Sequence, residues 1–513
     1  MQFETFDWIA HNASRRPEKT ALVDLASGRE IDYAEMDRRV GRLAGFLRGR
    51  LGIGPGDRVA LLAENSTDYL EIQFACFRAG AVFVPLNWRL TVPELNYIVS
   101  DAAPKAMIHD RGFAETAAAV QAETGFRHRL ETAADGSPSE FEAAIEEGPY
   151  EAEMIPQQMS DLSTIMYTSG TTGLPKGARI THGMTFVNTV NIGIPHRISA
   201  DSVTLTVLPL FHTGGLNAYA NPVLHAGGKV VVARSFDPEQ CLRLLADPEA
   251  GITNFLGVPA NFQFMAQLPA FEEADFGHVT VFGVGAAPTP HALIEVWATR
   301  NAPLAQAYGM TETAPLVMAL DPVDATRKIG SAGKPVLYTR TRVITEDGRQ
   351  AAPGERGELQ VAGPNVTPGY WNKPQETAES FDGEWLKTGD AVWVDEEGYY
   401  YIVDRWKDMY ISGGENVYPA EVENVLYRLD GIGEAAVIGI PDERWGEVGC
   451  AVVVRREGAA LEPQQILDHC EGQLARFKQP RRILFMDALP RNATGKVLKH
   501  ELRRMLAEGE LGG

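Results

Sequence analysis

Short apolar runs alternate with helical patterns along the first half of the chain. Residues 59–63 form one continuous apolar run, and residues 81–84 form the next. Between them, Ser66 can cap a helix at its start and Gly80 can end it. A further strand is expected at residues 104–109. This strand–helix–strand order predicts an open, mainly parallel sheet covered by helices, and such sheets bind ligands beside the carboxyl ends of their strands.

The same order of elements is expected to return in the middle of the chain. Residues 121–153 interrupt it, because they are acidic and show no clear apolar period. After this segment, residues 229–233 and 279–284 are apolar runs that predict strands of a second α/β layer.

The pattern changes beyond Ser331, where the apolar runs become short and are separated by turn signals. Asp-Gly or Glu-Gly pairs stand at residues 347–348, 382–383 and 397–398, between the runs. Strand, turn and strand in close succession predict a smaller, mostly antiparallel β unit. The strands expected in it are residues 342–344, 357–361, 384–386 and 399–403.

A domain boundary is expected at the dipeptide Asp404–Arg405, after which the α+β pattern returns. The predicted domains are therefore residues 1–404 and residues 405–513. The predicted fold class is α/β, with a large N-terminal domain of parallel-rich sheets and helices plus the small β unit. A smaller α+β domain follows it.

The composition is that of an ordinary globular protein with an acidic surface. Of the 513 residues, 44% are hydrophobic and 22% charged, and the formal net charge is −21 with a pI near 5.0. A surface with this charge repels phosphate backbones, so general nucleic-acid binding is disfavoured, although a local basic patch for a small phosphorylated ligand is allowed. The composition leaves a homodimer open.

The cysteines and the N-terminus predict a cytoplasmic protein. Cys76, Cys241, Cys450 and Cys470 stand far apart without zinc-ligand or CxxC spacing, which favours buried free thiols in a reducing compartment. The first residues are acidic and lack the apolar core of a signal peptide. The longest stretch without charged residues, 202–228, contains Pro and Gly, so no stable membrane insertion is expected.

A run rich in glycine and hydroxyl residues, at positions 167–177, carries the strongest chemical signal. It follows an expected strand at residues 164–166, and glycines there let the backbone approach an anion closely. Lys176 adds a positive charge, while the order of residues differs from a Walker A loop. The run predicts a loop that grips phosphate. Its expected binding residues are Thr168, Ser169, Gly170, Thr171, Thr172, Gly173 and Lys176.

This run resembles the phosphate loop of the adenylate-forming superfamily, which includes acyl-CoA synthetases, peptide-synthetase adenylation domains and beetle luciferases. Further segments of the chain are similar to the family's other motifs, in the family's order, so the resemblance covers nearly the whole chain. It implies that the substrates include ATP with Mg²⁺ and that the C-terminal domain is mobile.

The nucleotide site that the resemblance implies draws on three segments. In residues 306–313, Tyr308 would pack on adenine, Thr311 would meet the α-phosphate, and Glu312 would hold Mg²⁺, a role that suits a carboxylate. Asp390 would accept hydrogen bonds from the ribose hydroxyls. The remaining residues that the resemblance places at the nucleotide are Gly285, Ala286, Ala287, Gly309, Met310 and Arg405.

Two lysines near the C-terminal part of the chain match the family's hinge and catalytic loop. Lys407 would be the pivot between the domains, with the hinge at residues 404–407. Lys496 would meet the substrate carboxylate and the α-phosphate as negative charge builds there. With Lys176, Thr311 and Glu312, it completes the set of expected catalytic residues.

The acyl and thiol sites are also implied by resemblance. His212 would lie near the carboxylate or gate the acyl pocket, and a structural, hydrogen-bonded histidine is an equal alternative. Gly214 and Gly215 would leave room for an acyl chain or ring, and Val258 would shape another wall. The residues expected along the coenzyme A path are Ser412, Gly413, Gly414, Trp445 and Phe477.

The function that these segments predict is an ATP-dependent, AMP-forming acid–CoA ligase, which makes an acyl-CoA through an acyl adenylate and releases pyrophosphate. A medium- or long-chain fatty acid is the first expectation for the acid. An aryl acid of the hydroxycinnamate or benzoate type, or acyl transfer to a carrier protein, is the alternative. A protein that binds nucleotide without catalysis is disfavoured, because Lys176, Glu312, Asp390 and Lys496 occur together.

Overall fold

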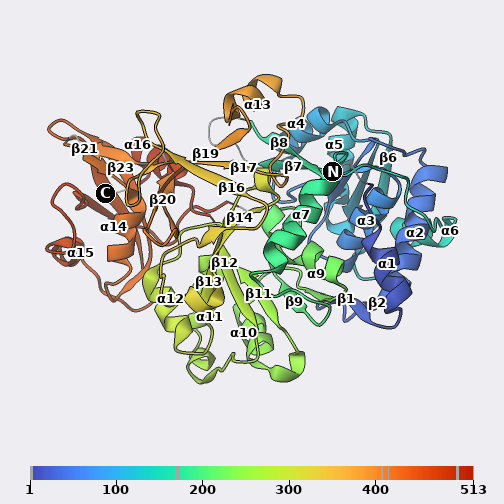
Figure 1. Ribbon diagram of the computed structural model, residues 1–513, viewed down its shortest axis with the longest axis horizontal. Coiled ribbons are helices and arrows are strands. Elements are labelled where there is room, and N and C mark those ends of the chain that lie inside the picture. The colour runs from blue at the N-terminus through green and yellow to red at the C-terminus, as the bar shows by residue number, and fades with distance from the viewer. Residues whose placement is uncertain (1–3, 169–173, 406–407, 414, 493–495, 512–513) are drawn as a thin grey trace.

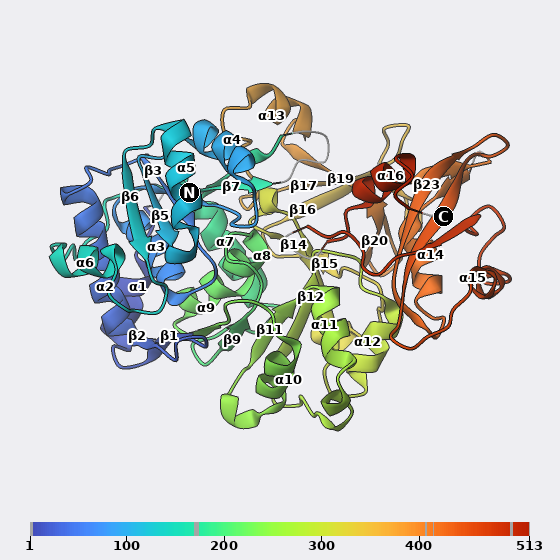
Figure 2. The same ribbon diagram turned by 180° about the vertical axis from the view of Figure 1, so that it is seen from behind.

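The computed structural model describes residues 4–168, 174–405, 408–413, 415–492 and 496–511. Two α/β layers formed by the first two thirds of the chain make up the larger part of the molecule (Figure 1). The C-terminal residues form a separate group of strands and helices at one end of it (Figures 1 and 2). This arrangement confirms the predicted fold class.

The first α/β layer is a six-stranded sheet in the order β6-β5-β3-β4-β7-β8. All its strands pair in parallel except β7 and β8, which form an antiparallel hairpin. The parallel pairing confirms the prediction from the apolar runs. The strands are β3 (Arg58–Leu62), β4 (Val82–Pro85), β5 (Ala106–Asp110), β6 (His128–Thr132), β7 (Leu162–Thr168) and β8 (Lys176–Thr181). The helices of this part are α1 (Trp8–Arg15), α2 (Tyr33–Gly49), α3 (Thr67–Arg78), α4 (Val92–Ala102), η1 (Arg111–Phe113), α5 (Ala114–Thr124) and α6 (Glu140–Glu147).

Residues 121–153 do not interrupt this layer, so that expectation is wrong. The segment contains the end of α5, the edge strand β6 and the helix α6. These elements are short and bury few side chains, since α6 buries Phe141, Ala144 and Ile145 while its other face is acidic. An apolar stripe of three residues is too short to give a clear period in the sequence.

The second layer is a nine-stranded sheet in the order β15-β14-β13-β12-β11-β9-β10-β1-β2, parallel in its centre and antiparallel toward both edges. Its strands are β1 (Thr20–Asp24), β2 (Glu30–Asp32), β9 (Val203–Thr206), β10 (Lys229–Val232), β11 (Asn254–Gly257), β12 (Val281–Gly285), β13 (Leu304–Gly309), β14 (Leu316–Ala319) and β15 (Lys334–Pro335). The helices are α7 (His182–Gly193), α8 (Thr213–Gly215), η2 (Leu216–Ala220), α9 (Asn221–Ala226), α10 (Pro238–Ala246), η3 (Pro248–Ala250), α11 (Pro259–Ala266), η4 (Pro269–Glu273), α12 (His291–Ala298), η5 (Thr311–Thr313) and η6 (Pro322–Asp324).

The β unit predicted beyond residue 331 is a five-stranded sheet, and all its pairings are antiparallel as expected. The turn glycines Gly348, Gly383 and Gly398 have positive φ angles of 84°, 61° and 84°, a conformation that favours glycine. The elements are β16 (Arg340–Ile344), β17 (Gly357–Ala362), α13 (Pro374–Ser380), β18 (Phe381–Asp382), β19 (Trp385–Val394) and β20 (Tyr400–Arg405).

The C-terminal part is a second five-stranded sheet, in which β23 and β24 form a long antiparallel pair and β25 joins β24 in parallel. The expected boundary at residues 404–405 coincides with the end of β20, and the position of the hinge stays a prediction. The elements are β21 (Tyr410–Ser412), β22 (Glu415–Val417), α14 (Pro419–Leu426), β23 (Ile432–Asp442), β24 (Gly446–Arg455), α15 (Pro463–Cys470), β25 (Arg482–Phe485) and α16 (Lys499–Ala507).

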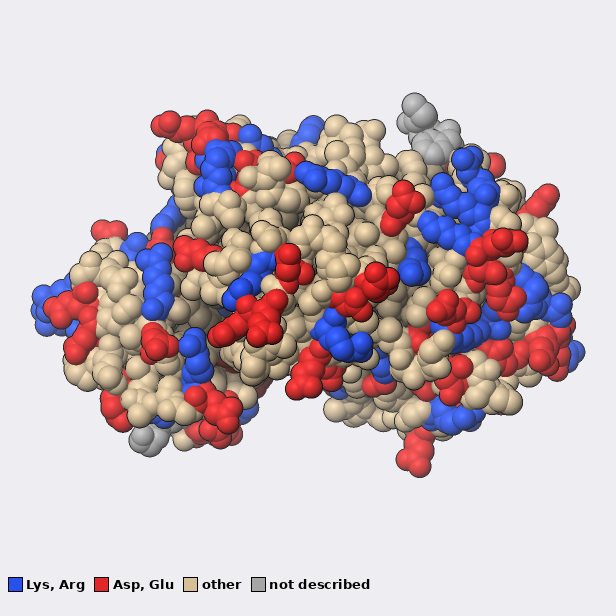
Figure 3. All heavy atoms as spheres, turned by 90° about the horizontal axis from the view of Figure 1, so that it is seen from below, with Lys and Arg blue, Asp and Glu red and all other residues tan. Residues whose placement is uncertain are grey.

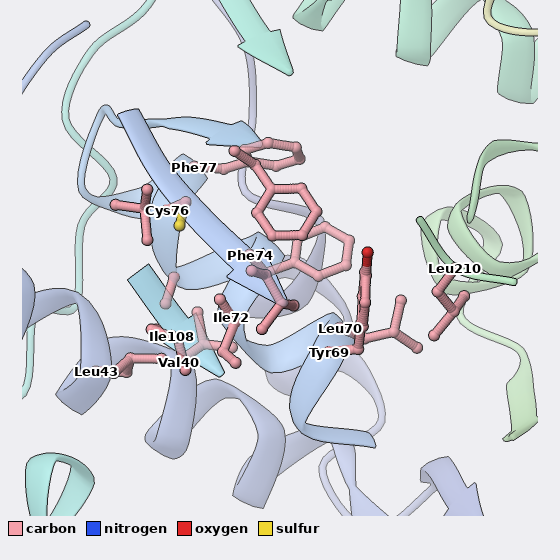
Figure 4. Close-up of a cluster of buried hydrophobic side chains, with 14 of the residues drawn as sticks. Val40, Leu43, Tyr69, Leu70, Ile72, Phe74, Cys76, Phe77, Ile108 and Leu210 are labelled. Carbon is pink, nitrogen blue, oxygen red and sulfur yellow. The ribbon is translucent and has the colours of Figure 1, made fainter. Parts of the chain in front are cut away.

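The helix α3 lies at the centre of the largest apolar core, and every one of its residues is buried. It contacts β4 of the first sheet and β1 of the second, so it joins the two layers. Figure 4 shows Tyr69, Leu70, Ile72, Phe74 and Phe77 of this helix packed with side chains of neighbouring elements. Burial of each such side chain contributes about 1.5–3 kcal/mol. The four cysteines are free and buried, as predicted.

The surface carries charges of both signs. On the face drawn in Figure 3, acidic and basic side chains lie interspersed. In the described part of the chain, no helix has the length and apolar character needed to cross a membrane.

Candidate active site

The hairpin of β7 and β8 positions the predicted phosphate loop. Thr168 at the end of β7 stands opposite Lys176 at the start of β8, so the two strands bring both ends of the loop together. Tyr167 anchors the hairpin, because its hydroxyl donates to Asp101 Oδ2 at 2.6 Å. The loop residues Ser169, Gly170, Thr171, Thr172 and Gly173 lie outside the described residues.

Tyr370 joins two of the predicted catalytic residues. The Lys176 ammonium lies 5.3 Å from the centre of the Tyr370 ring, within the range of a cation–π contact. The Tyr370 hydroxyl donates to Glu312 Oε1 at 2.8 Å. The structure therefore brings Lys176 and Glu312 to one tyrosine side chain, although 136 positions separate them in the sequence.

The sequence reasoning missed Tyr370. Its segment, residues 367–371, is held against β8 by the hydrogen bond from Trp371 N–H to Gly177 O (2.8 Å). It is also held beside η5 by the bond from Thr367 N–H to Glu312 O (2.7 Å). The signal that could have revealed it is the pair of aromatic residues after a Pro-Gly turn.

Glu312 offers an oxygen ligand that suits a divalent cation. Its side chain is largely buried in the short helix η5, where one oxygen accepts the bond from Tyr370 and Oε2 accepts none from the described residues. The described residues contain no cluster of three or more His, Cys, Asp or Glu that could hold a metal by themselves. One carboxylate fits Mg²⁺, which takes one or two carboxylates and completes its shell with water and substrate phosphates.

Tyr308 near the end of β13 and Asp390 in the middle of β19 form a second pair. The Tyr308 hydroxyl donates a hydrogen bond to Asp390 Oδ2, and Asp390 N–H donates to Thr388 Oγ1 at 3.1 Å. Asp390 is buried while Tyr308 is half-buried. Arg405 stands opposite Asp390 in the register of β19 and β20, and its side chain is not among those described. A flat ring and a carboxylate thus lie side by side, as a purine nucleoside requires.

The glycines near these pairs are required by close contacts of the backbone. A Cβ at Gly285 would lie 2.5 Å from Ala307 O, and one at Gly309 would lie 1.9 Å from Pro315 O. Gly285 ends β12, and Ala286 follows with a φ of 67°. The remaining predicted nucleotide residues of this region are Ala287, Met310 and Thr311, of which Thr311 is buried.

His212 is held by its own loop. Its Nδ1 accepts a hydrogen bond from the N–H of Gly214 at 3.1 Å, which fixes the ring at the start of α8. This bond supports a structural role for His212. Because His212 and Gly214 are half-exposed, a role of the histidine beside the carboxylate or at the acyl pocket also stays open. Gly215 is explained by packing alone, because a Cβ there would lie 2.2 Å from Pro209 O. Val258 is buried at the N-terminus of α11.

Two buried histidines make the folded state sensitive to acid. Burial lowers the pKa of His182 and His196 to about 4, whereas an unfolded histidine titrates near 6.5. Between these pH values the unfolded chain binds more protons than the folded chain, so stability falls as the pH falls through this window. We expect a loss of several kcal/mol between pH 6.5 and 4, about 3 kcal/mol for each histidine. Urea unfolding across this range measures it, and a flat or rising stability would contradict the expectation.

Lys496 lies ahead of α16 and is paired with Asn492. Its N–H donates to Asn492 Oδ1 at 2.9 Å, and Asn492 N–H donates to Lys496 O at 2.9 Å. This part of the chain is tied to β23 by the ion pair of Arg491 with Glu434 at 2.8 Å. Lys407, the predicted pivot, lies outside the described residues. The roles of both lysines remain predictions.

The residues predicted along the coenzyme A path include one close pair. Gly413 has a φ of 63° and donates its N–H to Trp445 O at 2.8 Å. A Cβ at Gly413 would lie 2.6 Å from the Trp445 ring, so the indole lies directly over the glycine. Ser412 is buried in β21, Phe477 packs at the edge of the C-terminal core, and Gly414 lies outside the described residues. Their role in thiol binding stays a prediction.

One ion cluster links the third sheet to the C-terminal part. Glu421 on α14 pairs with Arg356 from the start of β17, and its other oxygen pairs with Lys478 at 2.7 Å. The Arg356 guanidinium also lies 4.5 Å from the centre of the Tyr418 ring. These side chains are partly exposed, so each ion pair contributes about 0–1 kcal/mol.

Chemically, the arrangement can hold a nucleotide and neutralise its phosphates. The hairpin supplies a lysine and hydroxyls, η5 supplies a buried carboxylate for a cation, and the Tyr308–Asp390 pair supplies a surface for base and ribose. These groups come from β7 and β8, β13 with η5, and β19, which belong to three different sheets. Such a set can stabilise charge that develops at phosphorus.

Comparison with known proteins matches the whole chain. The family model "AMP-binding enzyme" matches residues 9–371, and the model "AMP-binding enzyme C-terminal domain" matches residues 421–496. The chain is 43% identical over 497 residues to a feruloyl-CoA synthase from Amycolatopsis sp, covering 97% of this chain and 98% of that protein. It is 40% identical over 515 residues to an indoleacetate–CoA ligase from Aromatoleum aromaticum, covering 98% of both.

Two further similarities bear on substrate and fold. The chain is 37% identical over 514 residues to a long-chain-fatty-acid–CoA ligase from Mycobacterium tuberculosis, covering 96% of this chain and 97% of that protein. Its structure resembles the crystal structure of ATP-bound MatB from Rhodopseudomonas palustris with a TM-score of 0.89 at 36% identity, covering 97% of this chain and 98% of that one.

Proposed function

This chain belongs to the AMP-binding enzyme family, and from that premise we propose that its acid substrate is an aryl acid of the hydroxycinnamate or arylacetate type. The type of reaction, without the identity of the acid, follows from family membership: the protein is an AMP-forming acid–CoA ligase that uses ATP and coenzyme A. The medium- or long-chain fatty acid expected first from the sequence is less well supported than the aryl alternative.

Two of the relatives support the aryl acid. The proteins at 43% and 40% identity are named for ferulate and indoleacetate, which both carry a flat ring, whereas the fatty-acid ligase stands at 37%. These values differ modestly, so a structural observation carries the proposal. Strand β12 presents two glycines, Gly283 and Gly285, on one face of the second sheet, with Ala305 and Ala307 beside them on β13.

A face without side chains favours a planar group. Alternate residues of a strand point to the same side, so Gly283 and Gly285 put no side chain of β12 on this face; Tyr219 covers Gly283, whereas Gly285 is half-exposed. Leu256 on β11 stands beside Gly283 and is half-exposed, as is Ala307. A ring can lie flat on this floor between Leu256 and Ala307, and such contact removes more apolar area from water than a mobile chain does for the same loss of conformational entropy.

The first half-reaction joins two anions, and the site residues are proposed to reduce their repulsion. The acid's carboxylate oxygen attacks the α-phosphorus of ATP, the bond to the β-phosphate oxygen breaks, and pyrophosphate leaves. Lys176 and the loop hydroxyls would hold the phosphates, and Thr311 and Lys496 would meet the α-phosphate. Tyr308 and Asp390 would orient the adenosine. Mg²⁺ held through Glu312 would supply Lewis-acid neutralisation of the phosphate oxygens.

In the second half-reaction the thiol of coenzyme A attacks the acyl carbon, AMP leaves, and the thiol proton passes to solvent. We propose that the C-terminal part, residues 405–513, turns about Lys407 between the two halves. Lys496 would serve the first half and withdraw for the second, when residues 412–414 and Trp445 would line the path of the thiol. A turn of this kind lets one site perform two reactions in sequence.

Pyrophosphate release from Mg·ATP across a panel of acids tests the proposal. The panel contains ferulate, cinnamate, benzoate, phenylacetate and indoleacetate beside butyrate, octanoate and dodecanoate, each with and without coenzyme A. We expect the highest kcat/KM for an aryl acid, with turnover that requires coenzyme A. A fatty acid with the highest kcat/KM would overturn the aryl proposal. Turnover with a holo-carrier protein in place of coenzyme A would identify the other acceptor.

A further inference from the structure

Tyr219 closes the inner end of the face on which the proposed aryl acid lies. It is 2% exposed and lies in η2, the helix that continues α8 beyond His212 and packs against β9 and β11. A Cβ added at Gly283 would lie 2.7 Å from the Tyr219 hydroxyl oxygen and 2.8 Å from a methyl carbon of Leu256. Tyr219 therefore covers Gly283, which we call the inner glycine, and does not cover Gly285, the outer glycine, where the acid would lie.

Tyr219 lies deeper in the fold than His212. His212 is the N-cap of α8, and Tyr219 lies seven residues further on, in the π-helical stretch η2 that continues α8. The outer turn is half-exposed at His212 and Gly214, whereas all of η2 is buried. Between these levels, Leu256 and Ala307 are half-exposed and pack in one cluster with Tyr219.

The hydroxyl of Tyr219 is fixed by a buried histidine. His196 Nδ1 and the Tyr219 hydroxyl oxygen are 2.6 Å apart, and the two rings meet edge to face at 78°. His196 is itself held by Asn254, whose amide donates to the His196 carbonyl at 3.0 Å. Both rings are completely enclosed, so the tyrosine cannot swing aside without breaking this bond.

The closed end also carries a polar atom that lacks a partner. His196 Nε2 is buried and has no hydrogen-bond partner among the described residues. The carbon between the two ring nitrogens, Cε1, lies 3.5 Å from the position that a Cβ on Gly283 would take, so this edge of the imidazole faces the same inner end. An apolar chain pushed to this level would leave the nitrogen without a hydrogen-bond partner, which is an unfavourable state for a buried polar atom.

We propose that Tyr219 is the end wall of the acyl slot and limits the length of the acids that this ligase accepts. The inference rests on the aryl-acid function proposed above and adds the residue that sets the length. A long fatty chain extended from the carboxylate site meets the phenol ring at the buried level of η2. A flat ring with a short side chain ends before it.

The experiment compares kcat/KM for dodecanoate with kcat/KM for ferulate in the full-length enzyme and its variants. Tyr219→Ala removes the wall, and we expect the ratio of kcat/KM for dodecanoate to kcat/KM for ferulate to rise at least tenfold. The reason is that the methylenes at the far end of the fatty chain would then contact apolar side chains. Tyr219→Phe keeps the ring and should keep the exclusion of dodecanoate. Tyr33→Ala is the matched control, because Tyr33 is equally buried and bonded, to Gly228 O at 2.7 Å, on the remote helix α2. It should cost stability without changing the ratio.

A ratio that changes less than threefold in a folded Tyr219→Ala variant would overturn the inference. If that variant does not fold, Gly283→Ala decides, because its methyl group would lie 2.7 Å from the Tyr219 hydroxyl and push the wall outward. We then expect a loss of at least tenfold in kcat/KM for ferulate and little loss for butyrate, and equal losses for both acids would contradict the wall.

The wild-type enzyme separates this inference from the function on which it rests. A wild type that prefers dodecanoate to ferulate overturns both the aryl-acid function and the wall. A wild type that prefers ferulate, combined with an unchanged ratio in Tyr219→Ala, overturns the wall alone.

Discussion

Lys496→Ala is expected to lose acyl-adenylate formation by about a thousandfold while it still forms thioester from supplied acyl adenylate and coenzyme A. The first half-reaction brings a carboxylate to a phosphate, so a removed ammonium group leaves the developing charge without its partner, and one such group is worth about 10²–10³ in rate. The second half-reaction begins with attack of the thiol on the uncharged acyl carbon, so it brings no second anion to the phosphate. Rapid-quench assays of each half-reaction measure the two rates separately.

A neighbouring lysine provides the control for Lys496. Lys499 lies three residues further on, at the start of α16, and pairs with Glu423 at 2.9 Å. Lys499→Ala removes the same charge from the same part of the molecule and should keep both half-reactions. Equal loss of both half-reactions in a folded Lys496→Ala enzyme would contradict the assignment, as would full adenylation activity.

Glu312→Gln should reduce adenylation by about 10²–10³ and raise the Mg²⁺ concentration needed for half-maximal rate. The amide keeps the shape of the side chain and can still accept the hydrogen bond from Tyr370, but it loses the charge that binds the cation. Initial rates at fixed ATP and increasing Mg²⁺ measure the effect. Because the substitution preserves the volume of a buried side chain, the fold should survive it.

The matched control for Glu312 is Glu346→Gln, which removes the charge of an exposed glutamate on the turn after β16. It should leave the dependence on Mg²⁺ unaltered. If Glu312→Gln lowers the rate without changing that dependence, the carboxylate acts through Tyr370 and Lys176 and does not hold the metal.

The parallel layers and the antiparallel unit were predictable because their signals are local. A strand buried on both faces is a continuous apolar run, as in β3 and β4, and a tight turn needs residues such as Gly348 that tolerate positive φ. The hairpin that carries Lys176 was predictable for the same reason. Residues 121–153 were missed because their elements are short and bury few side chains.

The contacts that assemble the site join residues far apart in the chain, and no local pattern reveals them. Tyr370 was not foreseen, since its importance depends on lying between Lys176 and Glu312. In the sequence, nothing distinguishes Tyr219 and His196 from ordinary core residues, because their contacts with Gly283 appear only in the fold. The role of Gly215 in the acyl pocket stays a prediction, and its contact with the carbonyl of Pro209 could not be foreseen. The choice between a fatty and an aryl acid could not be decided from the sequence, because the sequence carries no measure of depth.

Glu421 has a consequence for the proposed turn of the C-terminal part. Its partner Arg356 belongs to the third sheet, whereas Lys478 belongs to the same part of the chain as Glu421 and would travel with it. Glu421 would therefore leave one cation and keep the other, so no carboxylate is stranded when the interface opens. The ion pair of Glu421 with Arg356 would favour the domain arrangement seen in this structure by only a small free energy. Both this arrangement and the turned one could then be populated within one catalytic cycle.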